Sequence, residues 1–200
     1  ALIVEKVNQL KVGSGDSEDV SVGAMSSERQ LRIVEDHVAD FRAAGARIET
    51  GGRRNADFSP PDSRTEVRGP LFFAPTVITG ATNAMRGMRE ETFGPTLPIA
   101  TFKTEEEAVR LANDSEFGLT ASVWTRDYAK GRRVAQQIEV GTVCINEVLY
   151  THGIGQTPWG GFKFSGRGRT HGLEGLMELV QPQHVHTNHL ALLPDAWWMP

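Results

Sequence analysis

Apolar residues recur with helical spacing in several segments of the chain. In residues 1–10 the side chains of Ile3, Val7 and Leu10 fall on one helical stripe. No Ser, Thr, Asp or Asn precedes this run to cap it, so the helix begins without a start signal. We therefore expect that further sequence belongs upstream of Ala1.

A second helix is predicted to begin at Ser27, which forms a capping box with Gln30, and to end at Gly45. Four apolar residues at helical spacing define its inward face, and they are Leu31, Val34, Val38 and Phe41. A short strand is expected directly after this helix, at residues 46–50.

Residues 71–79 read LFFAPTVIT, a β-branched and aromatic run that is typical of a strand. Pro75 interrupts this run and cannot donate a hydrogen bond to a neighbouring strand. We therefore expect the strand to lie at the edge of a sheet or to bend. The preceding residues, 51–70, are rich in Arg, Asp, Ser, Pro and Gly and are predicted to form a polar loop.

From residue 98 onward the predicted strands and helices alternate. Strands at 98–102, 119–124 and 142–145 are separated by two helices, which Thr104 and Asp127 cap. Short apolar strands joined by helices of about ten residues are typical of right-handed crossovers in a parallel sheet. The fold class we expect is therefore α/β, with a mostly parallel sheet and helices on both of its faces.

The last part of the chain follows a different pattern. A Gly-rich loop at residues 153–172 leads into a short helix at 173–177. Residues 179–187 then alternate and include Pro182, which suits an exposed edge strand that a partner subunit can extend. The tail at residues 189–200 carries two adjacent tryptophans, which indicate docking against another surface.

Composition narrows the classes of function. The 200 residues are 39% hydrophobic and carry a net charge of -4 with no long basic run, so we expect no nucleic-acid partner. A single cysteine excludes an internal disulfide and indicates an intracellular, cytoplasmic protein. No apolar run reaches the length of a membrane span, and we expect no membrane partner.

Three motifs occur in order along the chain. They are EETFGP at residues 90–95, GTVCIN at residues 141–146 and PWGGFKFSGRG at residues 158–168. Together they resemble the aldehyde dehydrogenase superfamily, whose members show an E-E-x-F-G-P turn, a G-T-V-x-x-N strand end and a P-x-G-G-x-K-x-S-G-x-G loop at matching separations. The resemblance extends from Val4 to His186 and covers most of the chain.

The resemblance implies an aldehyde dehydrogenase catalytic-domain-like fold. Residues 1–177 would form the C-terminal portion of that domain, and residues 178–200 an oligomerisation strand and tail. The nucleophilic cysteine, the general-base glutamate and the Rossmann cofactor domain would lie upstream of Ala1. The implied reaction oxidises an aldehyde to a carboxylate through a cysteine thiohemiacetal, with NAD or NADP as the hydride acceptor. The chain alone would then be inactive, and the complete enzyme would be a homo-oligomer.

Within the first motif, the resemblance implies that Glu91 hydrogen-bonds the ribose hydroxyls of the nicotinamide half and that Phe93 packs beside the nicotinamide ring. A carboxylate suits this role because it accepts two hydrogen bonds from a vicinal diol. Glu90 is interpreted as structural. The family varies its substrate funnel in the loop that matches residues 147–157. The funnel candidates in this sequence are Leu149, Tyr150 and His152.

Two patterns, one of glycines and one of histidines, could suggest a nucleotide site and a metal site, but neither is expected. The glycines of residues 166–172 do not have the spacing of a dinucleotide fingerprint and are interpreted as turns. Three histidines close to the end lack the further ligands of a metal site, so no metal is expected; they are His184, His186 and His189. The family usually has an acidic residue near Thr170 or His171, and this sequence departs from the family there.

Two alternatives to a dehydrogenase fragment stay open. One is a non-catalytic module of this family that serves in assembly or scaffolding, which the upstream coding sequence would reveal. The other is a free-standing thiol enzyme that uses Cys144, which rapid alkylation at neutral pH would support. The apolar strand around Cys144 argues against the thiol enzyme, because a free cysteine in such a place behaves as a small hydrophobe.

Overall fold

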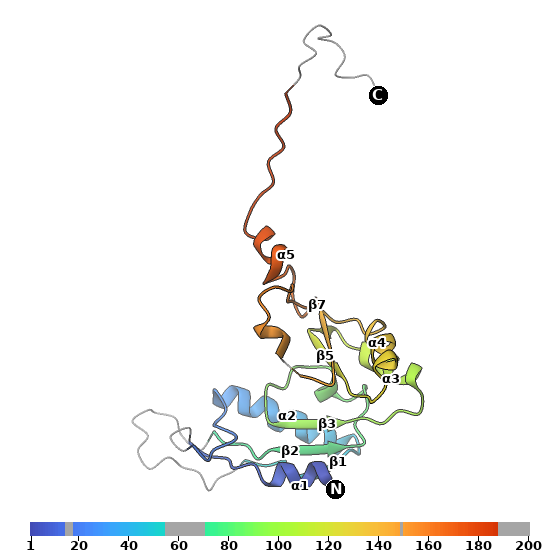
Figure 1. Ribbon diagram of the computed structural model, residues 1–200. Helices are drawn as coiled ribbons and strands as arrows, with labels where there is room; N and C mark the ends of the chain where they lie inside the picture. Colours follow the sequence, from blue (N-terminus) through green and yellow to red (C-terminus); the bar gives the residue numbers. More distant parts are fainter. Residues whose placement is uncertain (15–17, 55–70, 149, 188–200) are drawn as a thin grey trace, which may run out of the picture. The chain divides into compact units, whose positions relative to one another are not determined.

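In the described residues the strands are short and form three small sheets (Figure 1). The computed structural model describes residues 1–14, 18–54, 71–148 and 150–187. The chain divides into two units, Ala1–Glu116 and Phe117–Pro200. The division into a catalytic portion at 1–177 and a tail at 178–200 stays a prediction.

Helix α2 (Glu28–Ala43) forms where its apolar spacing predicts it. The Ser27 hydroxyl accepts a hydrogen bond from the Gln30 backbone N–H at 3.2 Å and so caps the first turn. This hydrogen bond is one half of the predicted capping box. The NH2 group of the Gln30 side chain donates to the Thr92 carbonyl at 2.6 Å. After the helix, Gly45 has φ 88°, the left-handed conformation that commonly follows a helix end.

The apolar face of α2 forms the core of the N-terminal unit. All four residues predicted to face inward are buried, namely Leu31, Val34, Val38 and Phe41. They belong to one apolar cluster together with Phe73 and Ile78. Burial of apolar surface is the main favourable contribution to folding, so this contact between helix and sheet determines where the other parts of the unit pack.

Strands β1 (Arg47–Thr50), β2 (Thr76–Thr79) and β3 (Thr96–Ile99) form the sheet of this unit, with β2 in the middle. β2 pairs antiparallel with β1 and parallel with β3. Successive side chains of a strand point to opposite faces, so Ile78 faces the α2 cluster and Val77 faces away from it. Both side chains are buried, which shows that β2 is covered on both faces.

The expectation that the strand predicted at residues 71–79 lies at the edge of a sheet is wrong, because β2 is the middle strand, and the run is interrupted at Pro75. β2 begins only at Thr76, after Pro75, so the proline removes no hydrogen-bond donor from the strand. The Thr76 backbone N–H donates to the Pro95 carbonyl at 2.8 Å, which ties the start of β2 to the segment before β3. The strand predicted at 98–102 is displaced as well, because β3 begins two residues earlier.

Three further helical segments complete the N-terminal unit. Helix α1 (Leu2–Asn8) has no side-chain cap and contacts β1 and β2. The 3-10 helix η1 (Arg86–Met88) lies against α2. Helix α3 (Glu105–Asn113) begins where predicted, because the Thr104 hydroxyl accepts from the Glu107 backbone N–H at 3.2 Å.

The C-terminal unit contains the β-α-β arrangement that the sequence predicts. Strands β5 (Thr120–Val123) and β6 (Thr142–Ile145) are parallel neighbours, and helix α4 (Tyr128–Ala135) connects them. The helices and parallel strand pairs are those of an α/β fold, as expected. The expected continuation of this sheet through residues 98–102 is wrong, because β3 pairs with β2 in the sheet of the other unit.

The same unit also contains a second strand pair and two short helices. Strands β4 (Phe117–Gly118) and β7 (Phe162–Lys163) are antiparallel. The 3-10 helix η2 (Tyr150–Gly153) and helix α5 (Gly172–Met177) flank the Gly-rich loop.

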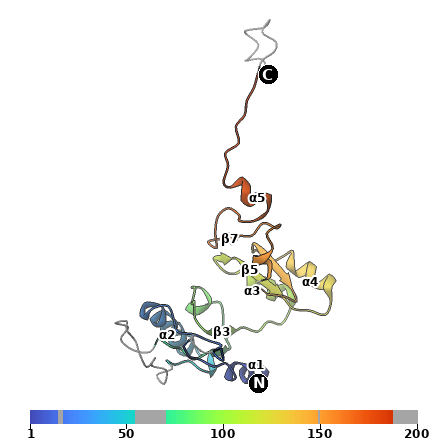
Figure 2. The same ribbon diagram turned by 60° about the vertical axis from the view of Figure 1, so that its left-hand side comes forward.

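The described chain beyond α5 runs on as an extended, exposed segment to residue 187 (Figure 2). It pairs with no strand in the described part of the chain, so the intersubunit strand at 179–187 stays a prediction. The tail at 189–200 and most of the predicted polar loop, residues 55–70, lie outside the described residues. No helix in the four described stretches has the length and apolarity needed to cross a membrane.

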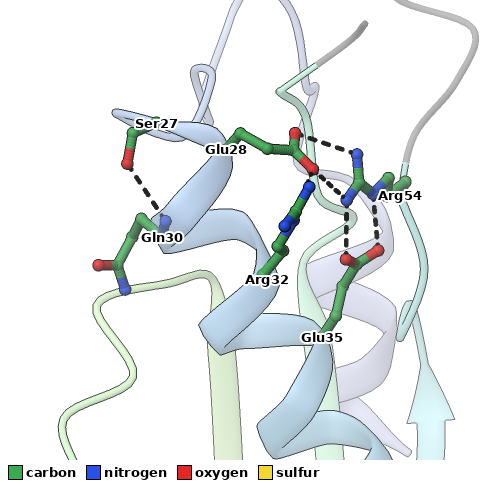
Figure 3. A network of polar contacts seen from close by, with 6 residues as sticks. All are labelled: Ser27, Glu28, Gln30, Arg32, Glu35 and Arg54. Carbon is green, nitrogen blue, oxygen red and sulfur yellow. Dashed lines mark hydrogen bonds and ion pairs between the residues drawn. The ribbon is translucent and has the colours of Figure 1, made fainter.

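Arg54 fastens the chain after β1 to the outer face of α2 (Figure 3). Its guanidinium contacts the Glu28 carboxylate at 2.7 Å and the Glu35 carboxylate at 2.7 Å. Glu28 also accepts from Arg32 at 3.3 Å, so two arginines share one carboxylate (Figure 3). The Arg54 hydrogen bond, the largest influence, keeps the pKa of Glu28 below its ordinary value of 4.5.

Arg54→Met is expected to lower the free energy of unfolding by about 1 kcal/mol at neutral pH, the upper end for partly exposed ion pairs. Because the folded-state pKa of Glu28 is lowered, its contribution is present above pH 4.5 and is lost as the pH falls through the lowered value. The difference between wild type and variant should therefore shrink in acid.

Urea denaturation at pH 7 and at pH 3 measures both effects. The matched control is Arg53→Met, which removes an exposed arginine one position earlier. An equal loss of stability in the two variants would show that the contacts of Arg54 with α2 do not matter.

Candidate functional site

The EETFGP motif forms a turn between η1 and β3 that lies on helix α2. Just before the turn, the Arg86 backbone N–H donates to the Asp40 carboxylate of α2 at 2.8 Å. At the other end the Pro95 carbonyl accepts from Thr76 at the start of β2. The turn, residues 90–95, is therefore held at both ends by the core of the N-terminal unit.

Two side chains of the turn point to the same buried residue of α2. The carboxylate of Glu90 lies 3.1 Å from Nε2 of His37, and the hydroxyl of Thr92 lies 2.9 Å from Nδ1. The His37 side chain is 0% exposed. A buried imidazole is costly unless both nitrogens have partners, and the turn supplies both of them.

Glu90 is also held from outside by an arginine. The Arg86 guanidinium donates to the second carboxylate oxygen of Glu90 at 2.8 Å. This hydrogen bond, followed by the one from His37, lowers the pKa of Glu90 to about 2. Glu90 is therefore an ionised anchor at neutral pH, which agrees with its interpretation as a structural residue.

Backbone contacts bring the turn still closer to the helix. The Gln30 side chain of α2 donates to the Thr92 carbonyl at 2.6 Å. Gly94 lies so close to Val34 that a β-carbon at this position would collide with the valine side chain. The glycine of the motif is thus required by close approach to α2.

The two residues predicted to bind the cofactor, Glu91 and Phe93, are exposed and take no part in this anchor. Glu91 is exposed and forms no hydrogen bond or ion pair with any residue that the structure describes. Phe93 is 76% exposed and has φ 43°, a left-handed conformation that is uncommon for an aromatic residue. The side chains of the turn therefore fall into two groups. Glu90 and Thr92 bind the turn to α2. Glu91 and Phe93 are exposed to solvent.

The second and third motifs meet within the C-terminal unit. Gly141, at the start of β6, lies against the carbonyl of Gly160 with no room for a side chain. The Gly118 backbone N–H donates to the hydroxyl of Ser165 at 2.9 Å. Asn146, at the end of β6, hydrogen-bonds both the N–H and the carbonyl of Thr125 at 2.8 Å. The small and polar residues of these motifs thus connect the strands with the loop.

The funnel candidates lie at the start of that loop. Tyr150 and His152 belong to η2 and are exposed, whereas Leu149 lies outside the described residues. The His152 ring meets Trp159 edge to face, with 4.9 Å between centroids. His152 and Trp159 therefore form an aromatic pair, of which the sequence interpretation named only the histidine.

Thr170 and His171, where the sequence departs from the expected family pattern, lie close to Trp159 and His152. Thr170 and Trp159 exchange backbone hydrogen bonds at 2.7 and 2.8 Å. His171 has φ 64°, and its Nδ1 is buried without a hydrogen-bond partner among the described residues. Its ring lies 6.0 Å from that of His152. The histidine is thus accommodated beside the funnel candidates, with one nitrogen unsatisfied.

The other reactive candidates do not form a site. Cys144 is 6% exposed in β6, and its sulfur lies 3.9 Å from the Thr151 hydroxyl. His184 and His186 stack on each other at 6.2 Å, and His189 lies outside the described residues. Within the described ranges no three His, Cys, Asp or Glu side chains gather as metal ligands. The glycines at 166, 168 and 172 have positive φ, consistent with turns.

His37 is a buried residue beneath the candidate site that the sequence did not predict. Its position between Val34 and Val38, on the face that turns inward, was a usable signal, because a polar residue there must find a buried partner. The identity of that partner was not readable, since Glu90 and Thr92 lie more than fifty positions away along the chain.

The profile of the aldehyde dehydrogenase family matches residues 1–185. The 4,4'-diapolycopene aldehyde oxidase of Methylomonas sp is 40% identical over 200 residues, which are 100% of this chain and 35% of that protein. A putative NADP+ succinate-semialdehyde dehydrogenase 2 of Mycobacterium ulcerans is 39% identical over 197 residues, 98% of this chain and 36% of its own length. The chain thus spans about a third of the curated relatives it matches.

A solved structure shares the fold as well as the sequence. Betaine aldehyde dehydrogenase of Staphylococcus aureus, crystallised in complex with NAD+, superposes with a TM-score of 0.84 at 39% identity. The match covers 99% of this chain and 37% of that one. Both the sequence motifs and the fold agree with these relatives, and the chain belongs to the aldehyde dehydrogenase family.

Proposed function

We propose that this chain is the C-terminal part of an NAD(P)-dependent aldehyde dehydrogenase, in which it places Glu91 and Phe93 against the nicotinamide end of the cofactor. The observation that carries the proposal is the division of side chains in the turn at residues 90–95. Glu90 and Thr92 bind α2, while Glu91 and Phe93 remain available for a ligand.

The chemistry of the two exposed residues fits this role. Glu91 offers a carboxylate with no partner in the described residues, and a carboxylate accepts both hydrogen bonds of a ribose diol. Phe93 offers an exposed ring on a backbone with φ 43°. Strained backbone conformations persist where the surroundings enforce them, and they cluster at ligand sites. When bound, the cofactor would supply the hydride acceptor.

The nucleophile is proposed to come from outside this chain. Cys144 is 6% exposed within a parallel strand pair, a poor position for attack on a carbonyl carbon. In the complete enzyme a cysteine thiolate would add to the aldehyde, and the resulting thiohemiacetal would lose a hydride and become a thioester. Water would then cleave the carbon–sulfur bond of the thioester, which releases the carboxylate and regenerates the thiolate. This chain would contribute the position of the acceptor and part of the aldehyde funnel.

The funnel wall is proposed to include the pair His152 and Trp159. Both rings belong to the C-terminal unit and meet edge to face, so each limits the movement of the other. Together with Tyr150, which is 72% exposed, they offer aromatic surface to a substrate. Such a wall suits an aldehyde with an apolar or unsaturated body more than a small charged one.

Glu91→Gln in the complete enzyme should slow hydride transfer about tenfold or more, because the amide keeps one acceptor but loses charge-assisted bonding to the ribose. Stopped-flow absorbance of the reduced cofactor in a single turnover measures this rate. The control is Glu116→Gln, which changes an exposed carboxylate outside the turn.

Glu90→Gln is a second comparison and should reduce the rate less than Glu91→Gln does, since its amide oxygen still accepts from one of the two partners of Glu90, Arg86 or His37, and Thr92 still binds the His37 ring. Equal rates for Glu91→Gln and wild type, or a larger loss in Glu90→Gln, would overturn the cofactor assignment. A complete enzyme that turns over no aldehyde at all would instead favour the scaffolding alternative.

Phe93→Ala should slow hydride transfer more than it weakens cofactor binding, because the adenosine half of the cofactor would be held elsewhere. We expect a loss of roughly tenfold in the single-turnover rate with a change of less than about threefold in cofactor Kd. Phe102→Ala, which removes another exposed ring of the same unit, is the control. A parallel change in Kd and rate would assign Phe93 to binding alone.

We propose that residues 179–187 form an intersubunit strand in a homo-oligomer. After a turn at Leu179 the segment is extended and exposed, and its apolar side chains include Leu179 and Val185, which are 82% and 78% exposed. An unpaired strand with an apolar side is prone to pair with a second chain.

Deleting residues 178–200 from the complete enzyme should therefore lower its oligomeric state, as measured by light scattering coupled to size-exclusion chromatography. A shorter deletion of residues 188–200 leaves the extended segment intact and should preserve the assembly. An unchanged mass after the longer deletion would contradict the proposal.

A further inference from the structure

His37 is the fully buried polar side chain on the apolar face of α2. Its neighbours on that face, Val34, Val38 and Phe41, are apolar core residues. Burial of a histidine in such a place does not by itself stabilise the folded state, because both ring nitrogens lose their hydrogen bonds to water on folding. Its presence there is therefore explained by what its two nitrogens bind.

The hydrogen bonds hold the ring at both nitrogens. The Glu90 carboxylate is ionised and only accepts, so Nε2 of His37 carries a proton and donates at 3.1 Å. Nδ1 lies 2.9 Å from the Thr92 hydroxyl, which can either donate to this nitrogen or accept from it. One rigid ring thus joins the residue before Glu91 to the residue after it.

Two further contacts complete this clamp, which we define as His37, Arg86 and Gln30 acting on the turn. Arg86 holds the second oxygen of Glu90 at 2.8 Å, and Gln30 holds the carbonyl of Thr92 at 2.6 Å. Both flanks of Glu91 are therefore bound through side chain or backbone. The peptide after Thr92 enters the left-handed conformation of Phe93, which needs such support.

We propose that His37 is a positioning residue for cofactor chemistry, because it fixes Glu90 and Thr92 and thereby aims Glu91 and Phe93. The inference rests on the function proposed above. His37 would not touch the cofactor. It would act by removing the rotational freedom of the turn, and hydride transfer is steeply sensitive to such freedom.

The first test measures position without the cofactor. A 4-fluorophenylalanine at position 93 of the cofactor-free enzyme reports the environment of this ring by its ¹⁹F signal. We expect one sharp line in wild type, and a shifted or broadened line in His37→Leu and in Thr92→Val. Thr92→Val removes only the hydroxyl at the surface of α2, so it remains informative if His37→Leu folds poorly.

The second test measures chemistry. His37→Leu and Thr92→Val should slow single-turnover hydride transfer roughly tenfold and change cofactor Kd less than about threefold. The primary isotope effect with deuterated aldehyde should rise as this step becomes limiting. His37→Gln keeps one donor and one acceptor and should recover most of the rate. Val38→Ala is the matched control, since it weakens the core beside His37 without touching the turn.

The outcomes separate the two proposals. If Glu91→Gln slows hydride transfer but His37→Leu and Thr92→Val leave both the ¹⁹F line and the rate unchanged, the positioning role is wrong and the cofactor assignment stands. If Val38→Ala produces the same losses as Thr92→Val, the effect is general destabilisation and the positioning role is again wrong. If Glu91→Gln has no effect, the proposed function itself fails.

Discussion

The N-terminal unit depends on one constraint, which is that the inward face of α2 must satisfy a buried imidazole as well as pack on a sheet. Leu31, Val34, Val38 and Phe41 meet the second requirement by ordinary apolar burial. His37 meets the first only if a polar segment lies over it, because both ring nitrogens are shielded from water. The turn before β3 is that segment, and its place on the helix follows from this need.

The turn at residues 90–95 has little conformational freedom once it is bound to α2. Glu90 is held by charge from Arg86 and by His37, and its lowered pKa shows how strongly its ionised form is preferred. Gly94 lies directly against Val34, with no room for a side chain between the turn and the helix. The strain at Phe93 is acceptable because both of its neighbours are fixed. The turn thus has many contacts with α2 on one side and exposed side chains, Glu91 and Phe93, on the other. These are the properties expected of an element that positions a ligand.

The C-terminal unit reaches a similar rigidity by different means. Its motifs meet through glycines that allow backbones to touch, as Gly141 and Gly160 do, and through Asn146, which replaces a missing strand partner for Thr125. The aromatic pair of His152 and Trp159 belongs to the same unit. Neither unit contains an exposed thiol among its described residues, so the contribution proposed for the chain is geometric, with the nucleophile supplied elsewhere.

The sequence by itself determined the local elements and the family. The helical spacing predicted the face of α2, side-chain caps located the starts of α2, α3 and α4, and the three motifs identified the family because such motifs are contiguous in the chain. These features depend on interactions between residues a few positions apart, which periodicity and capping chemistry report directly.

The tertiary structure alone decided how those elements pair. It placed β2 in the middle of its sheet and β3 beside it, although Pro75 and the alternation of elements favoured other arrangements. It also brought His37 to Glu90 and Thr92 across more than fifty residues. Strand order and long-range hydrogen bonds follow from the packing of the whole core, in which each contact depends on many others, and no local pattern of side chains encodes them.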